Sequence, residues 1–326
     1  MVVNHVFKSD MPTPFWSDEF RSRILGHREV LARLESLATQ GRTPPSLIFS
    51  GPSGIGKKRV ALEFAQVLVG DRKSLDFEAS MAMTEHILYV RPDGASIKID
   101  QVREANQFLQ LRRLGRSRVL IFDEAHLLNE QAANAMLKSV EEPPEQTHFL
   151  FITPSASQVL PTIRSRSQTL NFAPLDRAAL SEALRLQGLK VALTPELEAL
   201  CGGSVAVALD NLGDEVALEI AQAVKRFMQA LGTEQAGREL QTWKDLVKER
   251  DQHILVSRLL VQEIAASWRE QVRRPENPLD RRQLEKLSQL ALESQADLYR
   301  NVDRHLIWEN FLIASQRALQ EARVSR

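Results

Sequence analysis

The residues best suited to chemistry in this chain of 326 residues lie in one short glycine-rich segment. Gly51, Gly54 and Gly56 precede Lys57, and the spacing from Gly51 to Lys57 is that of a phosphate-binding loop. Glycines allow backbone N–H groups to curl around phosphate oxygens. A lysine at this position reaches the β and γ phosphates. The segment therefore predicts a site for ATP or ADP.

The residue that follows Lys57 departs from this pattern. A serine or threonine is expected there, because its hydroxyl holds Mg²⁺, whereas this chain has Lys58. A protonated lysine has no lone pair for a metal ion, and its charge opposes that of the cation. We therefore expect phosphate binding without efficient hydrolysis. The sequence leaves the use of Mg²⁺ open.

Two adjacent carboxylates, Asp123 and Glu124, follow the apolar run Val119–Phe122. In phosphate-loop NTPases an aspartate at the end of such a strand holds Mg²⁺, and a second polar residue positions the attacking water. In a parallel sheet this strand end lies at the same edge as the phosphate loop. The alternative interpretation is an acidic loop that caps the next helix.

The first half of the chain alternates between helical and strand patterns, which predicts an α/β fold with a parallel sheet. The expected strands span 47–50, 119–122, 148–153 and 167–172, and the clearest helices span 27–40, 59–69 and 130–141. From about residue 215 onward, apolar residues recur at helical spacing. We therefore expect an α/β domain over residues 1–173, a small helical lid over 174–214 and a helical C-terminal domain over 215–326.

Composition excludes several classes of protein. The chain has 42 Lys+Arg and 42 Asp+Glu, so a free-standing, strongly cationic nucleic-acid binder is not expected. Its one cysteine, Cys201, cannot form an internal disulfide, and fits a reducing cytoplasm. No apolar run of about 18 residues predicts a membrane span. The basic cluster Arg112–Arg118 has two interpretations, a contact with DNA phosphates and an ordinary solvated surface.

Two longer segments carry a family resemblance. Ile121–Thr153 and Leu160–Phe172 resemble the AAA+ clamp-loader family, and Arg91–Gln110 points to its delta-prime branch in bacterial DNA polymerase III rather than to the gamma/tau motor branch. Asn301–Leu312 resembles part of the helical collar of that branch. The resemblance implies a RecA-like P-loop domain, a lid and an all-α collar used for oligomerisation.

The resemblance also implies partners. Such subunits form a hetero-oligomeric ring with gamma/tau and delta subunits, and the ring opens the sliding clamp and places it on primed DNA. DNA-directed DNA polymerase activity belongs to the holoenzyme, because this chain has no candidate domain for nucleotidyl transfer.

The resemblance assigns roles to two further residues. Arg166, in Ser165-Arg166-Ser167, corresponds to an arginine finger that completes the ATP site of a neighbouring subunit. A surface arginine in a salt bridge is the alternative. Thr153 corresponds to a polar residue that senses the nucleotide, and an ordinary threonine at the end of a strand is the alternative.

The chain departs from active relatives at several points besides Lys58. The lid segment Gly203–Leu209 lacks the arginine that follows Gly-Ser in active subunits, and Ser167 replaces a cysteine. The segment Val69–His86 has no zinc-binding cysteines, so no zinc is expected. The sequence favours a delta-prime subunit with a degenerate ATPase. The alternatives are an active AAA+ ATPase, either the clamp-loader motor or another DNA remodeller, and a nucleotide-binding scaffold outside replication.

Overall fold

The computed structural model of the chain describes residues 15–16, 20, 24–70, 84–110, 117–189, 193–211, 213–273, 279–298 and 302–324. The chain divides into two compact units, Met1–Val191 with Gly203–Ala206 and Ala192–Gly202 with Val207–Arg326. Residues 174–214 are thus shared between the units. The three-domain division expected from the sequence stays a prediction.

The first unit is built on a parallel sheet with the strand order β2-β3-β4-β1-β5. Its strands are β1 (Ser46–Ser50), β2 (Ile87–Val90), β3 (Arg118–Phe122), β4 (Thr147–Thr153) and β5 (Gln168–Asn171). The four strands expected from the sequence are present, and the RecA-like α/β fold is confirmed. The edge strand β2 was not predicted, because four apolar residues are too few to show a period.

The register of the sheet brings the ends of three strands to one edge. Ser50 of β1 lies opposite Thr153 of β4, and Phe122 of β3 lies opposite Phe151 of β4. The loops that leave β1 and β3 therefore begin side by side, with the end of β4 between them. In open parallel sheets this carboxyl edge is where ligands bind.

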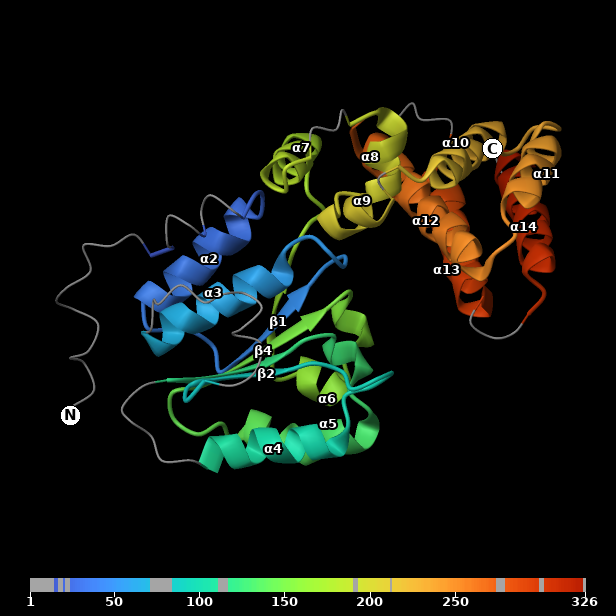
Figure 1. Ribbon diagram of the computed structural model, residues 1–326. Helices are drawn as coiled ribbons and strands as arrows, with labels where there is room; N and C mark the ends of the chain where they lie inside the picture. The colour runs from blue at the N-terminus through green and yellow to red at the C-terminus, as the bar shows by residue number, and fades with distance from the viewer. Residues whose placement is uncertain are drawn as a thin grey trace. The chain divides into compact units, whose positions relative to one another are not determined.

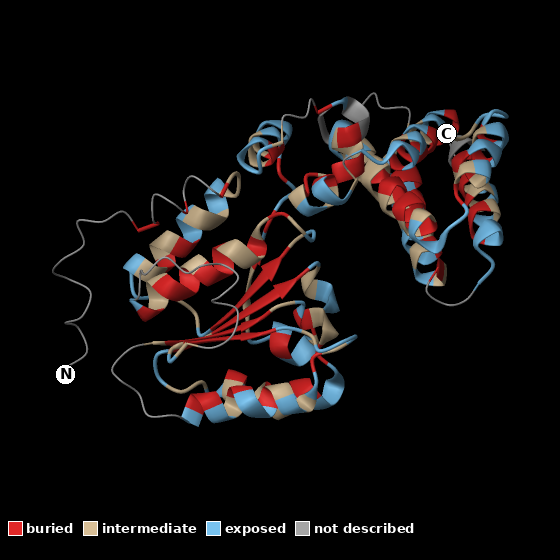
Figure 2. Ribbon diagram, in the orientation of Figure 1, coloured by how far each residue is buried: buried red, intermediate tan, exposed pale blue. Residues whose placement is uncertain are grey.

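Helices cover both faces of the sheet (Figure 1). One face is covered by α2 (Arg28–Thr39) and α3 (Lys57–Val69), and the other by α4 (Ile99–Gln110), α5 (Glu130–Glu141) and α6 (Pro161–Arg164). Strands β1, β2 and β3 are buried along their length and β4 nearly so (Figure 2), so they are largely continuous apolar runs rather than alternating ones, whereas only Leu170 is buried in the edge strand β5. One buried cluster contains Leu47 and Phe49, and a second contains Ile48, so successive residues of β1 pack on opposite faces.

The local sequence determines where helix α5, which leads away from the site, begins and ends. It spans Glu130–Glu141, as the sequence predicted, and the Asn129 side chain accepts a hydrogen bond from the Ala132 backbone N–H at 2.8 Å. This cap satisfies one of the N–H groups that every helix leaves without a partner in its first turn. Pro143 and Pro144 follow and prevent the helix from continuing.

The remaining helices complete the two units. In the first unit α7 spans Arg177–Leu186, and the short helix α9 (Val205–Asn211) begins there and continues into the second unit. The second unit contains α8 (Pro195–Cys201), α10 (Glu215–Ala230), α11 (Ala236–Leu246), α12 (Arg250–Arg273), α13 (Arg281–Leu298) and α14 (Arg304–Val324). Among the residues that the structure describes, no helix has the length and apolar character needed to cross a membrane.

Four aromatic rings from three helices form the centre of the second unit. Trp243 lies 4.6 Å from Phe227 and 5.5 Å from Trp308, measured between ring centroids, and Phe227 lies 6.2 Å from Phe311. All four side chains are buried. Rings of this size remove a large apolar area from water, which holds α10, α11 and α14 together.

One polar group is built into this core. His253 on α12 is only 2% exposed, and its Nδ1 accepts a 2.9 Å hydrogen bond from Trp308 Nε1. Burial, together with the nearby charges of His305 and Arg304, lowers the pKa of His253 to about 4, and the charge of Asp303 opposes the shift. The imidazole must be neutral at Nδ1 in order to accept this hydrogen bond.

We expect the second unit to lose stability as the pH falls. The unfolded chain binds a proton at His253 near pH 6.5, whereas the folded chain binds it only near pH 4. The loss therefore begins below about pH 6.5, ends near pH 4 and amounts to about 3 kcal/mol. Urea unfolding of His253→Gln should show a correspondingly shallower pH dependence than the wild type. A matched change of the exposed histidine, His305→Gln, should keep most of the wild-type dependence, and equal slopes for wild type and His253→Gln would contradict the assignment.

Candidate nucleotide site

The glycine-rich loop connects the end of β1 to the start of α3, as the motif predicted. Gly54 has a φ of +74°, and a Cβ there would lie 2.3 Å from Ser204 Oγ and 2.6 Å from the Ala206 side chain. Gly56 has a φ of +102° and immediately precedes α3. Only glycine adopts this backbone without strain at so close an approach. The loop therefore presents its backbone and the positive N-terminal end of α3 to a ligand.

Lys57 is buried under this loop. Its side chain is 6% exposed, and its Nζ donates hydrogen bonds to the carbonyl oxygens of Gly51 and Pro52, each at 2.5 Å. Burial lowers the pKa of Lys57 to about 8, and the charge of Asp123 opposes that shift. The ammonium is therefore mostly charged at neutral pH and is fixed to the loop, as a phosphate-binding lysine requires.

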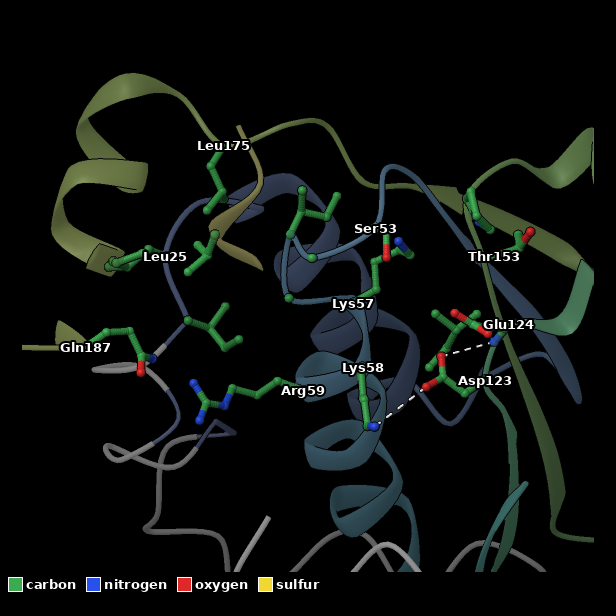
Figure 3. A pocket seen from close by; sticks show the side chains of 18 of the residues that line it. Leu25, Ser53, Lys57, Lys58, Arg59, Asp123, Glu124, Thr153, Leu175 and Gln187 are labelled. Atoms are coloured by element: carbon green, nitrogen blue, oxygen red, sulfur yellow. Dashed lines mark hydrogen bonds and ion pairs between the residues drawn. The ribbon is translucent and has the colours of Figure 1, made fainter. Parts of the chain in front are cut away.

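Asp123 leaves the end of β3 and is surrounded by donors (Figure 3). Its Oδ2 accepts a hydrogen bond from the Tyr89 hydroxyl and lies 3.7 Å from Lys58 Nζ, while its Oδ1 accepts one from the Glu124 N–H at 3.1 Å. The Lys58 ammonium also lies 4.9 Å from the centroid of the Tyr89 ring. Burial raises the pKa of Tyr89, and the hydrogen bond to Asp123 raises it further, so the phenol remains a donor.

Glu124 has an unusual backbone. Its φ is +49°, a region that residues other than glycine seldom enter. Such backbone outliers gather at functional sites, where the surrounding structure holds them in place. The side chain is exposed and lines the same pocket as Asp123, so the two acidic residues that the sequence singled out do lie together.

A pocket of about 690 Å³ in the first unit joins these groups. Its polar end contains Gly54, Gly56, Lys57, Lys58, Asp123, Glu124 and Thr153. Leu25, Leu175 and Gln187 lie away from Asp123 and Glu124 (Figure 3), and the apolar part of the lining also contains Ile24, Ala183 and Leu186. Thr153 is buried, and its Oγ1 donates a 3.0 Å hydrogen bond to the Ser155 carbonyl oxygen. The arrangement suits a ligand with an anionic end and a flat apolar end, which is the shape of a purine nucleotide.

The lid segment reaches the phosphate loop through its backbone. Val205 donates its N–H to the Gly54 carbonyl oxygen at 3.1 Å, and Val205 lines the pocket. Leu175 donates its N–H to the Gly203 carbonyl oxygen at 3.1 Å, which holds the segment in place. The segment that follows Gly203-Ser204 thus contributes the apolar side chain of Val205 to the pocket.

Arg166 does not line this pocket. It follows α6, its side chain is 40% exposed, and its Nη2 lies 2.7 Å from Glu141 Oε1. Its Nη1 donates to the Thr162 carbonyl oxygen at 2.9 Å and to Ser165 Oγ at 3.1 Å. The structure therefore separates Arg166 from the other predicted site residues and presents it on the surface.

Ser167 anchors the segment that carries Arg166. Its Oγ donates to the Ile163 carbonyl oxygen at 2.8 Å and lies 2.6 Å from Ser46 Oγ. Because the one hydroxyl proton of Ser167 is used on Ile163, Ser46 is the donor in the second contact. The serine that replaces the cysteine of the family thus ties this turn to the start of β1.

Two residues differ from what the sequence predicted: Tyr89 belongs to the site but was not expected there, and Arg118 was expected on the surface but is buried. Tyr89 lies on the unpredicted strand β2, and the only signal for it was the short apolar run 87–90. Arg118, counted in the basic cluster, is 3% exposed, and its Nη1 donates to the Leu109 carbonyl oxygen at 2.7 Å. Its guanidinium therefore packs inside the first unit and is not displayed for DNA. The cluster residues Arg112, Arg113 and Arg116 lie outside the described residues.

Within the described part of the chain, no group of three or more His, Cys, Asp or Glu side chains lies close enough to hold a metal ion. Residues 71–83, where relatives with a zinc module would carry it, lie outside that part. The absence of zinc stays a prediction.

Comparison with known proteins shows what the first unit is similar to. A family profile described as "DNA polymerase III, delta subunit" matches residues 26–176. DNA polymerase III subunit delta' of Pseudomonas aeruginosa is 35% identical over 191 residues, which cover 54% of this chain and 58% of that protein. The tau/gamma subunit of Haemophilus influenzae is 29% identical over 178 residues, 52% of this chain and 26% of that protein.

The similarity extends to an archaeal protein. The replication factor C small subunit of Picrophilus torridus is 29% identical over 174 residues, which cover 52% of each chain. The chain thus spans less than two thirds of the length of each of these relatives. The matched residues 26–176 include the phosphate loop, the acidic end of β3 and Arg166, so the similarity to DNA polymerase III subunits extends over the candidate site.

Proposed function

We propose that this chain is the delta-prime subunit of a bacterial DNA polymerase III clamp loader. It assembles with gamma/tau and delta subunits, and the ring loads the sliding clamp on primed DNA. Relatives named as subunits delta' and tau/gamma of DNA polymerase III support this proposal. Within the ring the chain binds ATP or ADP in its own pocket without efficient hydrolysis, and it completes the ATP site of a neighbour.

The observation that carries the proposal is the position of Arg166. Its guanidinium lies outside the chain's own pocket, in an exposed ion pair with Glu141. Exposed ion pairs of this kind contribute about 0–1 kcal/mol, so Arg166 can exchange Glu141 for a stronger anion at little cost. A planar guanidinium matches the oxygens of a phosphate and stabilises the charge that develops on a transferred phosphoryl group.

The composition of the pocket supports the second half of the proposal. Lys58 stands where the metal-binding hydroxyl is expected, and the lid segment Gly203–Leu209 lacks the arginine that the family resemblance implies for active subunits. Both changes remove groups that act on the γ-phosphate or its metal ion, while Lys57 and the loop glycines that bind phosphate are kept. A subunit of this kind holds a nucleotide but contributes to hydrolysis only through Arg166.

An active ATPase is the second candidate. It is favoured by the fact that Lys57, Asp123, Glu124 and Thr153 all line one pocket. Those four residues would suffice for nucleotide binding and for placing the attacking water. The two candidates differ in whether turnover belongs to this chain or to its neighbour, and each of the following experiments distinguishes them.

Replacing the proposed finger should abolish turnover at one site of the assembled ring. We expect Arg166→Ala to lower ATP turnover at the neighbouring site by about 10³-fold or more, because an arginine finger contributes about 10³–10⁵ in rate. Turnover is measured in reconstituted clamp loaders with clamp and primed DNA, in which the loop lysines of all other ATP sites are substituted.

The control for this experiment is the nearby exposed arginine, Arg164. Arg164→Ala removes the same charge from the same turn and should leave turnover close to that of the wild type. Size-exclusion chromatography shows whether each variant still assembles. Equal turnover in the Arg166→Ala and Arg164→Ala complexes would overturn the role of Arg166.

The isolated chain should hydrolyse almost no ATP. We expect its turnover to match that of a Lys57→Ala variant, which lacks the phosphate-binding ammonium, in a phosphate-release assay. Turnover that is well above this background, and that Lys58→Thr does not increase, would favour the active ATPase instead.

A further inference from the structure

The pocket of the first unit contains the two positions that hold Mg²⁺ in phosphate-loop NTPases, the residue after the loop lysine and the aspartate at the strand end. Here they are Lys58 and Asp123, and Lys58 Nζ lies 3.7 Å from Asp123 Oδ2. An ammonium has no lone pair to offer a metal ion, and it repels a cation placed beside it. The first of the two metal ligands is therefore replaced by a positive charge.

The second of these metal-binding positions, Asp123, already has hydrogen-bond partners. Asp123 accepts a hydrogen bond from the Tyr89 hydroxyl at Oδ2 and one from the Glu124 N–H at Oδ1. A metal ion bound by Asp123 would have to displace the ammonium and compete with these donors for the same oxygens. The residues present thus do not fit Mg²⁺.

Tyr89 fixes the ammonium as well as the carboxylate. Its ring is buried at the edge strand β2, and Lys58 Nζ lies 4.9 Å from the ring centroid. A cation above a ring face gains about 0.5–2 kcal/mol, depending on how far it is removed from water. Asp123, Tyr89 and Lys58 therefore form one positioned unit, which we call the lysine cluster, and it places a positive charge in the pocket.

The charges that line the pocket suit an anion that brings no metal. Three cationic side chains, Lys57, Lys58 and Arg59, line it together with two carboxylates, Asp123 and Glu124. The N-terminal end of α3 adds further positive potential at the loop. A lysine ammonium has three N–H donors, so Lys58 can face Asp123 and a phosphate oxygen at the same time.

We propose that this pocket binds the phosphates of a purine nucleoside di- or triphosphate without a divalent cation, with the lysine cluster in place of the metal ion. This inference rests on the proposal that the phosphate loop binds a nucleotide. The Lys58 ammonium neutralises the phosphates and is held by Asp123, as a metal ion would be. Unlike a metal ion, it is part of the chain and stays in the pocket when the nucleotide dissociates.

This arrangement reverses the sign of the coupling between nucleotide and Mg²⁺. In a metal-using site, bound Mg²⁺ strengthens nucleotide binding, and thermodynamic linkage makes the effect reciprocal. In this pocket, Mg²⁺ in solution instead competes with Lys58 for the phosphate oxygens. Excess Mg²⁺ should therefore weaken the apparent affinity of the chain for ATP.

Calorimetric titration of the full chain with ATP and with ADP tests the proposal, once with excess Mg²⁺ and once with excess EDTA. For the wild type we expect the dissociation constant for ATP to rise by about threefold or more when Mg²⁺ is added, a change of about 0.7 kcal/mol. For Lys58→Thr, which restores the hydroxyl, we expect Mg²⁺ to lower the dissociation constant by about tenfold. Lys98→Thr, which removes an exposed lysine paired with Asp93 at 2.6 Å, is the matched control and should behave as the wild type.

A second readout follows the metal directly. With ATP present, the electron paramagnetic resonance spectrum of Mn²⁺ should show a protein-bound ion for Lys58→Thr and none for the wild type. Circular dichroism verifies that each variant is folded, and Tyr89→Phe, which keeps the ring but removes one donor to Asp123, provides a second variant with intermediate behaviour.

Tighter binding of ATP to the wild type in Mg²⁺ than in EDTA would overturn the proposal, as would a wild-type Mn²⁺ signal. Failure of the wild type to bind nucleotide in either condition would also overturn it. None of these outcomes changes turnover at the neighbouring site in the Arg166 experiment, so failure of this inference is distinguishable from failure of the proposed role in the clamp loader.

Discussion

The parallel sheet of the first unit, covered by helices on both faces, is the constraint on which the site depends. Because β1, β3 and β4 run in the same direction and in register, the phosphate loop, Asp123 and Thr153 leave the sheet at one edge. The strands are buried on both faces, so a shift of register would expose apolar side chains and bury polar ones. Burial of the strands therefore fixes the spacing between Lys57 and Asp123 without a direct contact between the two side chains.

The charged side chains at this edge of the sheet determine what chemistry the pocket can perform. The same edge that brings a carboxylate to the phosphate loop also brings Lys58 beside it, and β2 adds Tyr89. In an NTPase a divalent cation would connect these elements, whereas here a side chain does. Under the proposed function, the hydrolytic and phosphate-binding roles of the loop are separated by a single residue, since the backbone cradle and Lys57 do not depend on residue 58.

In the second unit, the apolar stripes of the helices are buried against one another. Its centre combines four large rings with one neutral histidine, and the Trp308–His253 hydrogen bond satisfies two polar groups that burial would otherwise leave without partners. The helical spacing of apolar residues from about residue 215 onward predicted a helical domain, and the structure divides this region into α10, α11, α12, α13 and α14. The pairing of His253 with Trp308, which are far apart in the chain, left no signal in the sequence.

The sequence by itself determined the features that depend on local chemistry. The phosphate loop, the strands β1, β3, β4 and β5, the cap at Asn129 and the loss of a metal-binding hydroxyl at Lys58 all follow from residue types at short spacing. Only the tertiary structure decided which side chains meet. It placed Tyr89 of a four-residue strand against Asp123, buried Arg118 where a basic cluster suggested exposure, and put Arg166 on the surface beside Glu141. These contacts join segments that are distant in the chain, and they arise from strand order and helix packing, which one-dimensional spacing does not encode.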